Sequence, residues 1–270
     1  MLQIIDQINR NHVFKQIPIR IVSLVPSQTE LLFDLGLENS IAGITKFCVH
    51  PKHFLKEKTK VGGTKNPNFG KIKALNPDII VCNKEENTKE IIDECSKICT
   101  TWTTNIITIE DNFKMIQDFG QIFNLQENAK LLNEKLAFAL SNFKEFIKEK
   151  SIKKVTYFIW KNPYMVVGSN NYINEILRLN KFKNVFENNN FESNRYPEIQ
   201  IEMLEKYNLD LIFLSSEPYP FKEKDFIDLQ NYSKSKIIIV DGEMFSWHGS
   251  RLLLALDYFR FLDYSNHRII

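Results

Sequence analysis

The chain has 270 residues, of which 43% are hydrophobic and 25% are charged, and its formal net charge is +2. Domains average about 150 residues, so this length predicts two of them, and the apolar side chains suffice for two cores. The nearly balanced charge provides no strong field for nucleic acid or for an anionic membrane surface, and we expect neither as a partner.

The beginning of the chain shows no export or membrane signal. No apolar run approaches the roughly 18 residues of a membrane helix, and Asp6, Arg10 and Lys15 occupy the place of a signal core. The first cysteine is Cys48, so no early cysteine offers a lipid attachment site. We therefore expect a cytoplasmic protein as encoded, and a periplasmic or extracellular one if a leader has been removed.

Strand-like and helix-like segments alternate along the first half of the chain. The expected strands are 19–25, 41–45, 78–82 and 106–109, and the expected helices are 30–35, 68–76, 88–98 and 110–123. Alternation of this kind predicts parallel βαβ units.

Residues 126–150 contain no Gly or Pro, and their apolar side chains recur at helical spacing. We predict one long helix that links a lobe of residues 1–125 to a lobe of residues 151–270. In the second lobe the expected strands are 154–160, 164–167, 210–214 and 236–240, and the expected helices are 171–180, 199–208 and 250–263. The predicted fold class is α/β, with two Rossmann-like lobes of mainly parallel sheet joined by a single long backbone helix.

An internal repeat supports this division. Residues 72–82 and 204–214 align at an offset of 132, with identical residues at Asn76 and Asn208 and at Asp78 and Asp210. We infer duplicated lobes with a cleft between them.

Sequence signatures of common enzymes are absent. The chain has no G-x-G-x-x-G, P-loop, G-x-S-x-G, H-E-x-x-H or C-x-x-C motif, and no coherent set of acid, base and nucleophile. We expect a protein without catalysis and without an intrinsic cofactor.

Ligands of open α/β sheets bind outside the carboxyl ends of the strands. Several candidate residues fall in such positions: Pro26, Ser27, Phe47, Thr64, Trp160, Tyr196, Phe245, Trp247 and Arg251. Their aromatic faces and few hydrogen-bond donors favour a large flat or amphipathic small molecule.

The segments 20–36 (RIVSLVPSQTELLFDLG), 43–45 (GIT), 61–63 (VGG) and 68–81 together resemble one family. They are similar to the helical-backbone (class III) substrate-binding proteins of ABC importers, in the branch that takes up cobalamin or ferric siderophores. The resemblance extends from a hairpin at Asp6–Arg10 to the last helix. It implies a ligand clamped between two lobes, no catalysis and an ABC permease as partner.

The resemblance also implies roles for individual residues. The aromatic residues that contact cobalamin in the family correspond to Phe47 and Tyr196, whereas Thr64 stands where the family has a large aromatic. The family docks on its permease through one acidic residue per lobe. Glu202 matches the acid of the second lobe, and Gly70 stands in place of the first.

Our leading hypothesis is a monomer that binds a metal chelate, namely a corrinoid, a haem-like ring or a ferric siderophore. Arg251 would pair with a carboxylate or phosphate of the ligand. Cys48, His50 or His248 would reach an open axial position on its metal, although Cys48 and His50 also fit a plain solvent-facing turn. The alternative is a cytosolic tetrapyrrole-handling or chelatase-like protein on the same fold, and a bare interaction module is a third interpretation.

Overall fold

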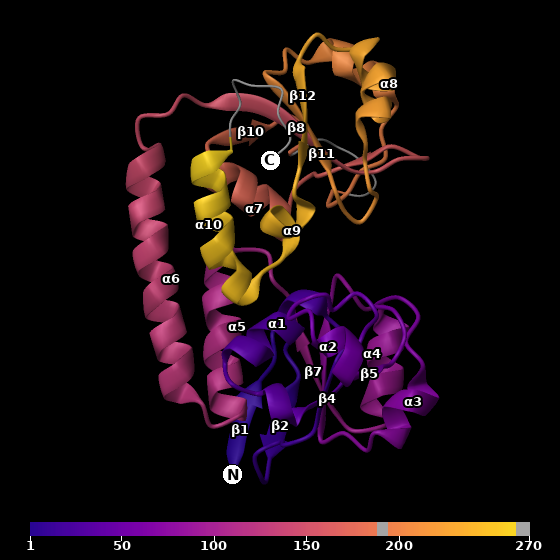
Figure 1. Cartoon of the computed structure of the whole chain (residues 1–270), viewed down its shortest axis with the longest axis vertical. Helices are drawn as coiled ribbons and strands as arrows, with labels where there is room; N and C mark the ends of the chain where they lie inside the picture. Colours follow the sequence, from indigo (N-terminus) through magenta and orange to yellow (C-terminus); the bar gives the residue numbers. More distant parts are fainter. Residues whose placement is uncertain (188–193, 263–270) are drawn as a thin grey trace. The chain divides into compact units, whose positions relative to one another are not determined.

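The computed structural model describes residues 1–187 and 194–262, and over these residues the chain divides into two compact units (Figure 1). We call them lobe one, which comprises Met1–Ala137 and His248–Leu252, and lobe two, which comprises Phe138–Trp247 and the described residues from Leu253 onward. None of the helices in these ranges combines the length and the apolar character that crossing a membrane requires.

Lobe one opens with an antiparallel hairpin of β1 (Leu2–Ile5) and β2 (Asn11–Phe14), which confirms the hairpin expected at its start. The buried Asp6 carboxylate organises the turn, because it accepts the Arg10 backbone N–H at 2.8 Å and the Arg10 side chain at 2.9 Å. Burial alone would raise the pKa of Asp6, but hydrogen bonds from His12 and Arg10 outweigh it and hold the pKa below its ordinary value.

The lobe-one sheet is parallel, with strand order β5-β4-β3-β6-β7. Its strands are β3 (Ile21–Ser23), β4 (Ile41–Ile44), β5 (Thr59–Lys60), β6 (Ile79–Asn83) and β7 (Thr100–Thr104). Its helices are α1 (Pro26–Asp34), the 3-10 turn η1 (Glu38–Ser40), α2 (Phe54–Glu57), α3 (Phe69–Ala74), α4 (Lys89–Ser96) and α5 (Ile109–Ile122). The predicted βαβ alternation is confirmed.

Helices cover both faces of this sheet, as Figure 1 shows for α3 and α4 on one side and α5 on the other. Successive side chains of a strand point to opposite faces. On one face Val22 of β3 and Ile80 of β6 share a core with Ile72 of α3 and Ile92 of α4. Since both faces are buried, the ends of the strands are the part of the sheet that remains for a ligand.

The helix α6 (Gln126–Ile147) runs without a break across the boundary between the lobes at Ala137. Its buried side chains include Leu136, Leu140, Phe143 and Ile147, which recur at helical spacing, and Ala129 is buried as well. The long helix expected over 126–150 is confirmed, although it ends at Ile147.

The lobe-two sheet has the order β10-β8-β11-β12, all parallel, with β9 antiparallel to β8. Its strands are β8 (Lys153–Trp160), β9 (Met165–Val166), β10 (Phe182–Asn184), β11 (Leu211–Ser215) and β12 (Lys236–Val240). The helices of the second half are α7 (Tyr172–Leu179), η2 (Ile201–Lys206), η3 (Glu223–Asp225), α8 (Phe226–Gln230), α9 (Gly242–Ser246), η4 (Gly249–Arg251) and α10 (Leu252–Phe261). Two α/β lobes of mainly parallel sheet confirm the predicted fold class.

The internal repeat has a structural counterpart. The helices α3 and η2 begin and end 132 residues apart, and so do the strands β6 and β11. In lobe one Asp78 Oδ2 accepts the backbone N–H groups of Ile19 and Arg20, each at 2.9 Å. In lobe two Asp210 Oδ2 accepts that of Lys154 at 2.7 Å. The repeated aspartate therefore fixes the start of the neighbouring strand in both lobes.

Two predictions of secondary structure are wrong, one in its position and the other in its helix type. No strand forms at 106–109, because Thr108 caps α5 in a reciprocal capping box with Asp111, and the strand of this region is instead β7 at Thr100–Thr104. The helix expected at 199–208 is the 3-10 helix η2. The edge strands β5 and β10 were not predicted.

Candidate functional site

The carboxyl ends of β3 and β4 carry the first group of predicted residues. Pro26 is the first residue of α1 and is partly exposed, whereas Ser27 is buried. Proline suits this position because its missing N–H would have no partner in the first helical turn. Sheet and helix thus meet at a tight turn that places both residues at the strand end.

Phe47 follows β4 and is 49% exposed, which is unusual for a phenylalanine. The ring lies against the backbone of Gly63, where an added Cβ would come within 3.3 Å of Phe47 Cε2. The Lys46 ammonium lies 4.9 Å from the ring centroid. A glycine turn therefore supports an aromatic ring with its apolar surface accessible.

Thr64 follows that turn and is buried, and its carbonyl accepts a hydrogen bond from Asn87 Nδ2 at 2.9 Å. Asn87 Oδ1 in turn accepts the Asn83 N–H at the end of β6, also at 2.9 Å. Burial raises the pKa of the carboxyl of Glu86, the residue before Asn87. The charge of Lys65 and a hydrogen bond with Thr64 lower this pKa, but by less than burial raises it. Asn83, Glu86 and Asn87 were not predicted at this strand end, although polar residues directly after an apolar strand were an available signal.

Arg251 is buried and already has a partner within lobe one. Its Nε and Nη2 atoms donate to the two carboxylate oxygens of Glu30 at 2.8 and 2.6 Å. The expectation that Arg251 pairs with a ligand anion is therefore corrected, because this two-point ion pair uses the guanidinium inside the protein.

The segment around Arg251 is anchored to lobe one by Asn112. Asn112 Oδ1 accepts the Gly249 N–H at 2.5 Å, and its Nδ2 donates to the Gly249 carbonyl at 3.2 Å. Gly249 has a φ of +89°, and an added Cβ would lie 3.1 Å from Leu31 Cβ, so the turn requires glycine. The segment 248–251 is therefore a fixed part of lobe one.

The three alternative axial ligands have different surroundings in the structure. Cys48 is fully buried and its Sγ lies 3.2 Å from the hydroxyls of both Thr29 and Thr45, so it does not lie on a solvent-facing turn. His248 is buried with Nδ1 3.4 Å from Ser27 Oγ, and burial lowers its pKa to about 3. His50 is half-buried near Glu30. The prediction is corrected for Cys48 and His248, because packing encloses both side chains.

In lobe two, Trp160 ends β8 and is 39% exposed, with its ring 5.7 Å from that of Tyr219. The following hairpin is held by Lys161, whose ammonium donates to Asp225 and Asp228 at 2.7 Å each. Tyr164 adds a hydrogen bond to Asp228 at 3.0 Å. The hairpin therefore presents Trp160 from a fixed support.

Phe245 and Trp247 lie closer to the core than predicted. Phe245 belongs to α9 rather than to a loop, and its fully buried ring packs on Tyr157 and Phe259 with centroids 5.0 and 4.9 Å apart. The buried Trp247 donates its indole N–H to Glu217 Oε1 at 2.9 Å. The placement of Phe245 in a ligand loop is wrong, because a short helix turns its side chain into the core.

The remaining predicted residues keep surface positions. Tyr196 is half-buried in a segment whose backbone pairs with β9, through the Val166 N–H to the Pro197 carbonyl at 3.1 Å. Glu202 is exposed in the first turn of η2, and Gly70 is exposed at the equivalent place in α3. Glu217, two residues beyond β11, was missed, although Glu85 is its counterpart at the offset of 132.

Two α/β lobes of mainly parallel sheet and the long helix α6 indicate the class of solute-binding proteins. The chain matches the family model described as periplasmic binding protein over residues 21–236, and it belongs to that family.

Curated relatives agree with this assignment. The chain is 25% identical over 267 residues to an uncharacterized ABC transporter substrate-binding lipoprotein, YvrC, of Bacillus subtilis, covering 93% of this chain and 82% of that protein. It is 24% identical over 192 residues to a vitamin B12-binding protein of Vibrio vulnificus, covering 68% and 67%.

Solved structures show the same fold. A periplasmic heme binding protein from Pseudomonas aeruginosa superposes with a TM-score of 0.78 at 18% identity, over 90% of this chain and 91% of that one.

Proposed function

We propose that this protein binds a metal chelate without transforming it, and that the chelate is a corrinoid, a haem-like ring or a ferric siderophore. The observation that carries the proposal is the accessible Phe47 ring on its glycine support at the carboxyl end of β4. The relatives named for vitamin B12 and heme support the same ligand class.

Large planar chelates are recognised through aromatic faces and a few fixed polar groups. Phe47 of lobe one and Trp160 of lobe two retain exposed ring surface, and Tyr196 is half-buried. Pro26 of lobe one is partly exposed at the neighbouring strand end. We propose that these residues contact the ligand, and that Phe245 and Arg251 support them from within their own lobes.

We further propose an ABC permease as the partner, with Glu202 as a docking residue of lobe two. Glu202 is exposed on a short helix, as a docking acid must be. Gly70 offers no charge at the equivalent place in lobe one, so a partner would meet acidic docking charge on lobe two only. The relatives' names, lipoprotein and periplasmic protein, support a site of action outside the cytoplasmic membrane.

The test is a titration of the chelate-free protein with cyanocobalamin, haemin and one ferric siderophore, followed by tryptophan fluorescence. The partly exposed Trp160 is the expected reporter. Saturable quenching by one compound at micromolar concentration supports the proposal. No response to any compound overturns it, and conversion of a porphyrin with free metal into a metalloporphyrin would replace it with the chelatase-like function.

The aromatic contribution is tested with Phe47→Ala, and Phe138→Ala is the control, since Phe138 is 71% exposed and lies within the helix α6 rather than after a strand. Loss of one ring contact costs about 1–1.5 kcal/mol, or about tenfold in affinity. We expect that loss for Phe47→Ala and an unchanged Kd for Phe138→Ala. Equal affinities in both variants would contradict the role of Phe47.

A further inference from the structure

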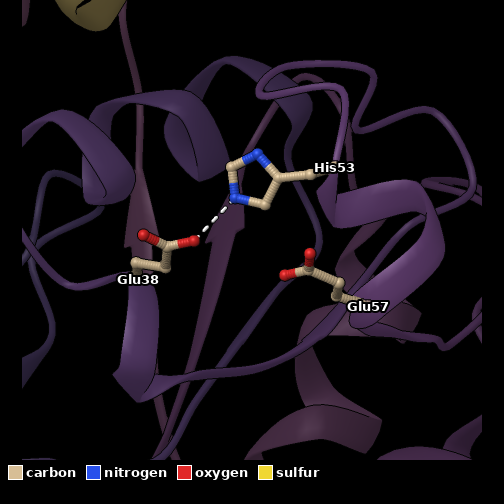
Figure 2. Close-up of side chains that lie close together, drawn as sticks. All are labelled: Glu38, His53 and Glu57. Atoms are coloured by element: carbon tan, nitrogen blue, oxygen red, sulfur yellow. Dashed lines mark hydrogen bonds and ion pairs between the residues drawn. The ribbon is translucent and has the colours of Figure 1, made fainter.

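Three potential metal ligands lie together on lobe one, apart from the strand-end residues. Glu38 begins η1, just before β4, whereas His53 directly precedes α2 and Glu57 ends it. One ligand atom of each residue lies within 4.8 Å of those of the other two. Figure 2 shows both carboxylates close to the imidazole, with the His53 ring joined to Glu38. Because Glu38 precedes β4 and Phe47 follows it, the trio belongs to the opposite end of that strand.

The local structure orients the imidazole. Its Nε2 lies 2.6 Å from Glu38 Oε1, and the ring packs edge-on against Phe33 and Phe54 with centroids 5.8 and 5.0 Å apart. Glu57 stands one helical turn after His53, and its N–H donates to the His53 carbonyl at 3.1 Å. Residues four apart on a helix project from the same face. The short helix α2 therefore positions His53 and Glu57, and the turn η1 positions Glu38.

The electrostatic surroundings of the three residues permit a cation to bind. Among the described residues, the Glu57 carboxylate has neither a hydrogen-bond nor an ion-pair partner. The nearby Lys58 ammonium donates to the Glu38 backbone carbonyl at 2.6 Å and lies 5.1 Å from the Phe54 ring centroid, and neither of these contacts is with a carboxylate of the trio. The side chains of His53 and Glu38 are each 41% exposed, which gives a hydrated ion access.

We propose that Glu38, His53 and Glu57 bind a divalent transition-metal ion of the Zn²⁺ type, with water completing its coordination. One imidazole nitrogen with two carboxylate oxygens is a donor set that Zn²⁺ accepts. The ion would link the turn before β4 to the helix after it. It would thereby restrain the segment that carries Phe47, and it is separate from any metal inside the bound chelate.

The experiment is isothermal titration of ZnCl₂ into the purified, tag-free and chelate-free protein. We expect one Zn²⁺ per chain, with affinity at least about tenfold weaker in His53→Ala and in Glu57→Gln. The matched control is Glu134→Gln, which removes an exposed carboxylate from the middle of α6 and should leave binding unchanged. Unfolding temperatures measured with and without Zn²⁺ provide a second readout, because a bound ion stabilises the folded state.

Absence of saturable Zn²⁺ binding by the wild-type protein would overturn the proposal. So would binding that survives in both His53→Ala and Glu57→Gln, because the ion would then occupy other residues. Since no chelate is present in the assay, either result is independent of the chelate titration.

Discussion

Lobe one and lobe two share a scaffold and differ at their strand ends. Asp78 and Asp210 fix equivalent strands, and the sheet orders correspond from β4 to β7 and from β10 to β12. At the strand ends, lobe one holds the segment 248–251 through Arg251 and Asn112, whereas lobe two carries a hairpin fixed by Lys161. The backbone-fixing contacts of the repeat are retained in both lobes, while the loops available to a ligand have diverged.

The largest expected effect tests the shared scaffold. Ile80 and Ile212 are fully buried at equivalent places in β6 and β11. Replacing either with Ala removes buried methyl groups and leaves a cavity, so each variant should lose about 2–5 kcal/mol of unfolding free energy. Urea denaturation measures both, with the exposed Ile227→Ala as control. A loss in only one of the two would break the equivalence of the lobes.

The second prediction concerns a feature of lobe one only. Burial lowers the pKa of His248 to about 3, so the folded protein excludes a proton that the unfolded chain binds below its ordinary pKa of about 6.5. The contribution of neutral His248 is therefore complete above pH 6.5 and declines as the pH falls toward 3, by up to about 1.4 kcal/mol per pH unit.

The measurement is the unfolding free energy of the wild type and of His248→Gln across this pH range. Carboxylates titrate in both proteins, so the difference between the two curves isolates the histidine. We expect the variant to show a shallower loss below pH 6.5. Parallel curves would contradict a buried, neutral His248.

The smallest effect separates the two aspartates. Asp78 accepts two backbone N–H groups and Asp210 accepts one from Lys154. Both sites are partly exposed, so we expect about 2 kcal/mol for Asp78→Ala and about 1 kcal/mol for Asp210→Ala. Chemical denaturation of the two variants checks the order. A larger loss in Asp210→Ala would show that the lobes use the repeated residue differently.

Local patterns in the sequence predicted most of the fold. The strand before Pro26 and the uninterrupted helix that ends at Ile147 were predicted, because each is determined by residues that are close in the sequence. The strand β7 was missed because Thr100–Thr104 is mostly threonine and offers little apolar signal. The edge strands β5 and β10 have two and three residues, too few to show a period.

The site was less predictable, since its residues are fixed by contacts between distant parts of the chain. Phe47 and Trp160 were predicted as ligand residues from their places at the ends of predicted strands, and both rings are partly exposed in the structure, but their contact with a ligand stays a prediction. Arg251 was misassigned because its partner Glu30 lies 221 residues away, and no spacing in the sequence indicates that pair. Phe245 was misassigned because the five-residue helix α9 carries no periodic signal.

The central claim is that this member of the periplasmic binding protein family holds a chelate unchanged. The most direct measurement is equilibrium dialysis of the wild-type protein against the compound that quenches its fluorescence, followed by mass analysis of the released ligand. The account predicts one chelate per chain, recovered chemically intact. Absence of retained ligand, or recovery of an altered compound, would contradict it.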